Sequence, residues 1–112
     1  MCIIPKFVSN DVVAKLSQAK QLVEDGWCQH LFAIPEDDER FNYCTVGAMC
    51  STTFDKGETF DKMVNTFIKA NNLPPSDYVM GKMTSITIWN DAPERTKEEV
   101  LAAFDKAIAY AE

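Results

Sequence analysis

Tyr-Cys-Thr-Val-Gly-Ala-Met-Cys, residues 43–50, is a run without a single charged side chain in a chain in which 25% of the residues are charged. Such a run is most simply a buried segment, because ionised side chains are rarely buried. We predict a short buried helix here. Gly47 would cost that helix about 1 kcal/mol relative to alanine. We therefore attribute Gly47 and Ala48 to close packing, since their small size lets a neighbouring helix approach.

Apolar residues at helical spacing predict three longer helices around this central segment. The first covers about residues 10–25, the second about 59–72, and the third begins at Thr96. In each of them, apolar residues recur every three or four positions, as in a helix that buries one face. The expected inward residues are Val12, Leu16, Ala19 and Val23, then Phe60, Met63, Val64, Phe67 and Ile68, then Val100, Leu101, Phe104, Ala107, Ile108 and Ala111.

Two helix ends carry clear signals. Thr96 and Glu99 match a capping box, in which each side chain accepts a hydrogen bond from the backbone N–H of the other residue. Gly26 suits the left-handed position that follows a helix, and there Trp27 would fold back on Leu22. We expect a structural role for these residues.

The segment 76–89 has no clear helical pattern. Ile86 and Ile88 alternate with Thr87 as in a short strand, and such a strand needs a partner. Residues 2–4 and 31–34 are the two candidates. A minor β-hairpin is therefore left open beside the helices.

The fold class that follows is mainly α. We predict a small single-domain helical bundle with three longer helices and a short buried central one. The 112 residues suffice for one globular domain, 1–112, in which residues 1–8 form an N-terminal extension.

Composition excludes several function classes. The net charge of -6 repels nucleic-acid phosphates, so we expect no nucleic-acid binding. No stretch approaches the roughly 20 apolar residues of a membrane span, so we expect no membrane partner. Four cysteines without a secretory signal favour a cytoplasmic protein with reduced thiols.

Three motifs occur in a fixed order along the chain. They are Gly26-Trp27-Cys28-Gln29, Cys44-x-x-Gly47-Ala48, and Trp89-Asn90-Asp91-Ala92-Pro93 running into Thr96-x-x-Glu99-Val100. Together, over about residues 16–111, they resemble a family of small uncharacterised proteins from bacteriophages and bacteria, known only as a domain of unknown function. The resemblance implies a mostly helical single domain and a phage origin. It implies no activity, cofactor or catalytic residue.

Two reactive constellations can be drawn from the cysteines. In the first, Cys44 or Cys28 is a nucleophile with His30 as its base and Asn90 or Asp91 as the orienting group. Burial in an uncharged segment would raise the pKa of Cys44 and leave it inert, however. The second is a metal site made of cysteines and the histidine. These residue types suit Zn²⁺, but their spacing along the chain lacks the paired short intervals of structural zinc sites, so we expect no metal and no cofactor. Its members would be Cys28, His30, Cys44 and Cys50.

Polar residues next to both tryptophans form the remaining candidate site. Before a proline and a helix start, Asn90 and Asp91 serve naturally as turn formers, and this is the interpretation we favour. In the alternative, two indoles enclose a flat ligand whose edge contacts an amide and a carboxylate. The candidate ligand-binding residues are then Trp27, Gln29, His30, Trp89, Asn90 and Asp91.

The function expected from these observations is a non-enzymatic binding protein. It would be a phage accessory factor in the host cytoplasm that engages a host protein or sequesters a small-molecule ligand such as a signalling nucleotide. An acidic surface favours a partner with a basic patch. An uncovered apolar stripe would allow a homodimer. The alternative is a cysteine-dependent hydrolase or transferase that uses Cys44 or Cys28 with His30.

Overall fold

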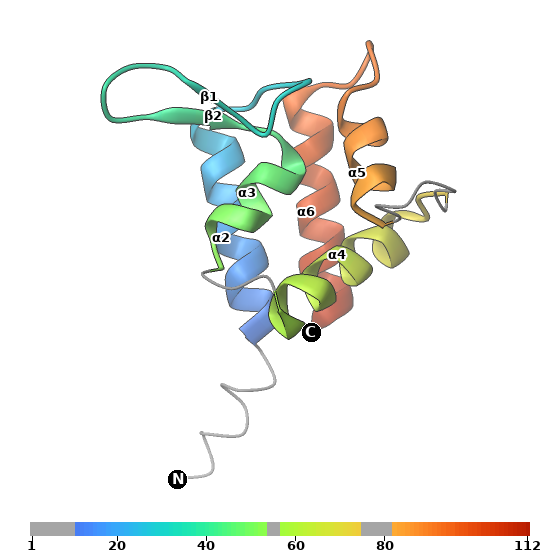
Figure 1. The fold of residues 1–112 in the computed structure, drawn as a ribbon. Helices are drawn as coiled ribbons and strands as arrows, with labels where there is room; N and C mark the ends of the chain where they lie inside the picture. The colour runs from blue at the N-terminus through green and yellow to red at the C-terminus, as the bar shows by residue number, and fades with distance from the viewer. Residues whose placement is uncertain (1–10, 54–56, 75–81) are drawn as a thin grey trace, which may run out of the picture.

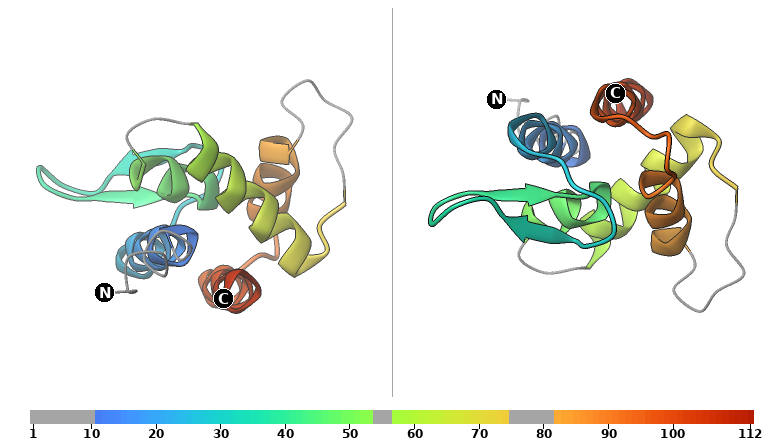
Figure 2. Two further views of the ribbon diagram at one scale, coloured as in Figure 1. Left: turned by 90° about the horizontal axis from the view of Figure 1, so that it is seen from below. Right: turned by 90° about the horizontal axis from the view of Figure 1, so that it is seen from above.

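Helices α2 (Asp11–Asp25) and α6 (Lys97–Ala111) lie side by side and run in opposite directions, forming one layer of the domain (Figure 1). The second layer holds the remaining elements and is clearest in the end-on views of Figure 2. The computed structural model describes residues 11–53, 57–74 and 82–112. In the second layer lie strands β1 (Ala33–Pro35) and β2 (Phe41–Tyr43) and helices α3 (Thr45–Ser51), α4 (Glu58–Asn71) and α5 (Lys82–Asn90).

This arrangement confirms a mainly α domain with a minor β-hairpin. The three longer helices and the short central helix are all present, and α5 is an additional helix. The N-terminal extension, Cys2 and the candidate strand 2–4 lie outside the described residues, as do residues 75–81. No helix in the described ranges is long and apolar enough to cross a membrane.

The core lies between the two layers, and its centre is Phe67 of α4. The Phe67 ring meets Phe104 of α6 edge-on at 5.2 Å between centroids and Trp89 of α5 at 5.7 Å. Edge-to-face pairs of this kind stabilise beyond simple burial by about 0.5–1.5 kcal/mol. The fully buried apolar side chains that surround this point are Leu16, Ala19, Val23, Val46, Ala48, Met49, Met63, Ile86, Val100 and Ala107.

Residues 44–49 of the uncharged central stretch are buried as predicted, but the first two residues of the stretch lie outside the helix. Tyr43 belongs to strand β2, and Cys44 is the N-cap of α3, where its Sγ accepts a hydrogen bond from the Gly47 N–H at 3.3 Å. The close approach at Gly47 is made by the backbone of Phe32 and not by a neighbouring helix. A Cβ at Gly47 would overlap the Phe32 carbonyl oxygen and lie 2.8 Å from its carbon.

The prediction of a strand at residues 86–88 is wrong. These residues belong to α5, where Ile86 is fully buried and Ile88 is exposed. On a strand, residues two apart point to the same face, whereas on a helix they point in nearly opposite directions, so the burial of Ile86 and the exposure of Ile88 fit the helix. The hairpin forms instead between β1 and β2, in antiparallel register with Ile34 opposite Asn42.

The predicted helix ends were right at α6 and wrong in detail at α2. The capping box is complete, with Thr96 N–H donating to Glu99 Oε1 at 2.9 Å and Glu99 N–H donating to Thr96 Oγ1 at 3.2 Å. After α2, Gly26 does not adopt the left-handed conformation. A Cβ at Gly26 would meet the end of the Asn42 side chain, which would have to move to make room. The constraint on this position is therefore contact with Asn42 and not a left-handed backbone.

Candidate functional site

The three sequence motifs meet at Asn90, the last residue of α5, whose side chain is fully buried. Its Oδ1 accepts hydrogen bonds from the Thr45 N–H at 3.0 Å, the Thr45 hydroxyl at 2.7 Å and the Trp27 indole N–H at 2.9 Å. Its Nδ2 donates to the Cys28 carbonyl at 3.3 Å and to Asp91 Oδ1 at 2.9 Å. One amide therefore joins α3, α5 and the segment after α2.

Gln29 and His30 add a second set of contacts to the same turn. Gln29 Nε2 donates to the carbonyls of Asn90 at 3.0 Å and Ala92 at 2.9 Å. The His30 N–H donates to Asp91 Oδ1 at 2.8 Å. His30 has a left-handed backbone with φ of 77°, a conformation that costs a non-glycine residue about 1–2 kcal/mol. The bond to Asp91 helps to hold it there, while the imidazole itself is exposed.

Trp89 faces a different environment from Trp27. Its ring packs edge-on against Phe67, and the Arg95 guanidinium lies 4.3 Å from the ring centroid. Arg95 Nε also donates to the Trp89 carbonyl at 2.9 Å. The two indoles are thus engaged with different protein groups, one with Asn90 and the other with Phe67 and Arg95.

All six residues predicted from sequence therefore gather around one turn. In the described part of the chain, the Asn90 and Asp91 side chains bond to each other and to distant residues, and not to the backbone of their own turn. They therefore join distant segments, which differs from the local turn-forming role that we favoured. Both the oxygen and the nitrogen of the Asn90 side-chain amide are hydrogen-bonded to protein groups. A ligand-binding role for the six stays a prediction.

The two buried thiols are held in their protonated form. Cys28 Sγ donates to the carbonyls of Leu31 at 3.3 Å and Asn42 at 3.4 Å. Burial, with a smaller contribution from nearby Cys44, raises the pKa of Cys28 to about 11. Burial also raises the pKa of Cys44. Since the thiolate is the nucleophile, these values weigh against a cysteine-dependent enzyme at neutral pH.

The raised thiol pKa predicts a loss of stability in alkali. Above pH 9, the ordinary pKa, the unfolded chain releases the Cys28 proton while the native state keeps it up to about pH 11. The stabilisation is therefore complete below pH 9 and is lost as the pH rises toward 11. Urea unfolding at about pH 8 and pH 10.5 should show a larger loss for the wild type than for Cys28→Ala. Equal losses would contradict the assignment, because every other titrating group is shared.

His30, Cys28, Cys44 and Cys50 are not part of any metal-binding cluster among the described residues. In residues 11–53, 57–74 and 82–112, no three side chains of His, Cys, Asp or Glu gather closely enough to hold a metal ion.

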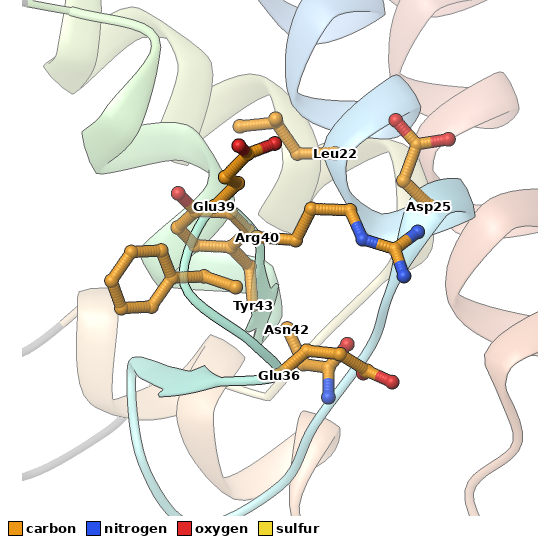
Figure 3. A pocket seen from close by; sticks show the side chains of 8 residues that line it. Leu22, Asp25, Glu36, Glu39, Arg40, Asn42 and Tyr43 are labelled. Carbon is orange, nitrogen blue, oxygen red and sulfur yellow. The ribbon is translucent and has the colours of Figure 1, made fainter.

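A pocket of about 430 Å³ lies between the end of α2 and the β-hairpin (Figure 3). Sequence reasoning missed this pocket. The signal that could have found it is the acidic run at residues 36–39, which is followed by Arg40 and then by the aromatic Phe41. The pocket is lined by Leu22, Asp25, Glu36, Glu39, Arg40, Phe41, Asn42 and Tyr43.

The outer face of the hairpin beside this pocket is apolar. Phe41 lies opposite Pro35 and Tyr43 opposite Ala33, so these four side chains share one face. We call them the hairpin face. Phe41 is 47% exposed, and its ring centroid lies 6.2 Å from that of Tyr43. Exposed Leu31 and Phe32 precede β1.

Comparison with known proteins agrees with the resemblance seen in the motifs. A family model described as a family of unknown function (DUF6197) matches residues 9–110. No curated protein and no solved structure matches the chain.

Proposed function

The chain belongs to DUF6197, a family of unknown function, and we propose that it is a non-enzymatic binding protein that docks a partner protein on its hairpin face. The observation that carries the proposal is the gathering of exposed apolar side chains on and before the hairpin. Three of the five large hydrophobic residues exposed in the described ranges, Leu31, Phe32 and Phe41, lie in this short segment. Of these three, Phe41 lies on the hairpin face itself, and Leu31 and Phe32 directly precede it in the chain. Exposed apolar surface of this kind is typical of protein interaction sites.

The hairpin face is held in place before any partner arrives. The Tyr43 N–H donates to the Gly26 carbonyl at 2.9 Å, and the Cys28 N–H donates to the Tyr43 carbonyl at 3.1 Å. Just before the other strand, the Phe32 carbonyl accepts from the Cys44 N–H at 3.1 Å. A surface that is already ordered loses less conformational entropy on binding, and this supports a docking role.

A partner protein fits this surface better than a signalling nucleotide does. The neighbouring pocket has three carboxylates, Asp25, Glu36 and Glu39, against one guanidinium, that of Arg40. Nucleotide phosphates would be repelled by this lining. The buried thiols of high pKa make a hydrolase or transferase the weaker alternative.

The biological setting that we propose follows from the resemblance and not from the geometry. It is a phage accessory factor that acts on a host protein in the host cytoplasm. A homodimer through the hairpin face is disfavoured, because two copies would bring their acidic pockets together.

Site-specific photo-crosslinking tests the proposal. A benzoylphenylalanine at position 41 should crosslink one protein in a bacterial host extract, whereas the same group at position 110 should not. Tyr110 is the matched control because it is an aromatic residue with 59% exposure in the last turn of α6. Figure 1 shows that this end of α6, next to the C-terminus, lies away from the β-hairpin.

The crosslinked protein is then purified and its affinity measured. Phe41→Ser should weaken its binding at least tenfold, since the loss of a buried phenyl contact costs about 1.5–3 kcal/mol. Tyr110→Ser should leave the affinity unchanged. An unchanged affinity for Phe41→Ser, or equal crosslinking at both positions, would overturn the proposed docking face.

A further inference from the structure

We infer that the partner segment is basic: the pocket beside the hairpin face receives a lysine or arginine side chain while an adjacent apolar side chain packs on Phe41. This inference rests on the proposed function, because it names the chemistry of the segment that docks there. The occupant is an extended segment of another protein with a cationic residue next to an apolar one.

The pocket and the hairpin face are continuous. Phe41 and Tyr43 belong to both, so one short segment can contact both at once. The volume of about 430 Å³ lies within the range of about 300–1,000 Å³ that is usual for ligand sites, and a long side chain can enter it. Leu22 lines the pocket on the side of α2, where it can pack against the aliphatic part of a lysine or arginine.

The charges that line the pocket favour a cation. The positive charge of Arg40, a lining residue, is paired with a carboxylate that is not part of the lining, because Arg40 Nε lies 3.4 Å from Asp37 Oδ2. Backbone hydrogen bonds, first from the Glu39 N–H and then from that of Arg40, hold the pKa of Asp37 below its ordinary value. Glu36 and Glu39 form no ion pair with any residue in the described part of the chain. Their carboxylates remain available to an incoming ammonium or guanidinium group.

Two aromatic rings add a second attraction for the same ligand. Phe41 and Tyr43 belong to the pocket lining, and their ring planes are inclined at 44°. A cation above such a ring gains about 0.5–1 kcal/mol at an exposed site and more when it is desolvated. A carboxylate or phosphate would lose both this term and the attraction of the acidic lining.

The edge of the hairpin is a poorer docking site than its face. β1 ends at Pro35, which has no N–H to offer a pairing strand. Side-chain contacts on the face and in the pocket, and not the addition of a strand, therefore select the partner.

The test uses a probe pair that differs only in charge. The peptide acetyl-Gly-Leu-Arg-Leu-Gly-amide is titrated into the 112-residue protein. Its counterpart carries citrulline, a neutral isostere, in place of arginine. Backbone amide shifts of residues 36–43 report binding. We expect the arginine peptide to bind at least fivefold more tightly, and this preference to shrink as the salt concentration rises.

Variants in the loop locate the charge effect. Glu36→Gln and Glu39→Gln should each lower the affinity for the arginine peptide and leave the affinity for the citrulline peptide unchanged. Asp38→Asn is the matched control, because Asp38 is an exposed acid of the same loop but is not part of the pocket lining. This variant should bind the arginine peptide with the affinity of the wild type. Superimposable amide spectra elsewhere in the domain verify that the variants are folded.

Equal affinity for the two peptides, or no detectable binding of either at millimolar concentration, would overturn the inference. So would an equal loss of affinity in Asp38→Asn and Glu36→Gln. These outcomes are separable from failure of the proposed function. If Phe41 crosslinks a partner that binds through a neutral segment, docking on the hairpin face stands and the basic segment is wrong.

Discussion

Gly47→Leu is expected to lower the free energy of unfolding by about 3 kcal/mol, at the upper end of the usual cost of overpacking. The added side chain would begin at a Cβ that already overlaps the Phe32 carbonyl oxygen. That carbonyl cannot withdraw freely, because it accepts the hydrogen bond from Cys44 N–H that connects the segment before β1 to the start of α3. Urea unfolding monitored by circular dichroism would measure the loss.

Gly47→Ala separates this explanation from helix propensity. Alanine is the better helix former by about 1 kcal/mol, so propensity alone predicts a more stable protein. The contact with Phe32 predicts a less stable one. Ala102→Leu, at an exposed position of α6, is the control for added bulk and should change stability by no more than about 0.5 kcal/mol. A Gly47→Ala variant as stable as the wild type would refute the close-approach argument.

Asn90→Leu is expected to be as damaging or worse, with a loss of about 3 kcal/mol or more. Leucine has a similar size but accepts nothing, so the Trp27 indole N–H and both donors of Thr45 lose their acceptor. Each buried polar group left unsatisfied costs about 1–3 kcal/mol. Thermal unfolding followed by the fluorescence of Trp27 and Trp89 would detect the loss and show whether the local environment changes first.

Asn90→Asp tests the hydrogen-bond pattern through pH. A carboxylate keeps the acceptor for Trp27 and Thr45, but it loses the donor to the Cys28 carbonyl and places a second charge beside Asp91. Burial and the Asp91 charge would both raise the pKa of the new carboxyl group. Its stability should therefore be best in acid and fall as the pH rises through that pKa.

A double variant provides the control for this pH effect. Adding Asp91→Asn removes the second charge while keeping an oxygen for the His30 N–H, so part of the loss at neutral pH should be recovered. If Asn90→Asp follows the wild type at every pH, Asn90 is not the buried centre of the network.

The long helices and the α6 capping box were predictable from sequence because their signals are local. Leu16, Ala19 and Val23 repeat at helical spacing, and Thr96 and Glu99 lie three residues apart, within one helical turn. The α5 helix was not predictable in the same way. Its β-branched residues favour a strand, and burial of Ile86 against the bundle overrides that preference.

The candidate sites, like the helices, were only partly predictable from the sequence. The sequence by itself identified the six motif residues and the uncharged stretch around Gly47, since composition and order are visible in one dimension. Only the tertiary structure showed that Asn90 bonds to Thr45, which lies 45 positions away in the chain, and to Trp27, which lies 63 positions away. It also showed that the backbone of Phe32 leaves no room for a side chain at Gly47. The pocket likewise needs Leu22 from α2 and Phe41 from the hairpin. Contacts between distant segments form only when the two layers pack, so no local pattern records them.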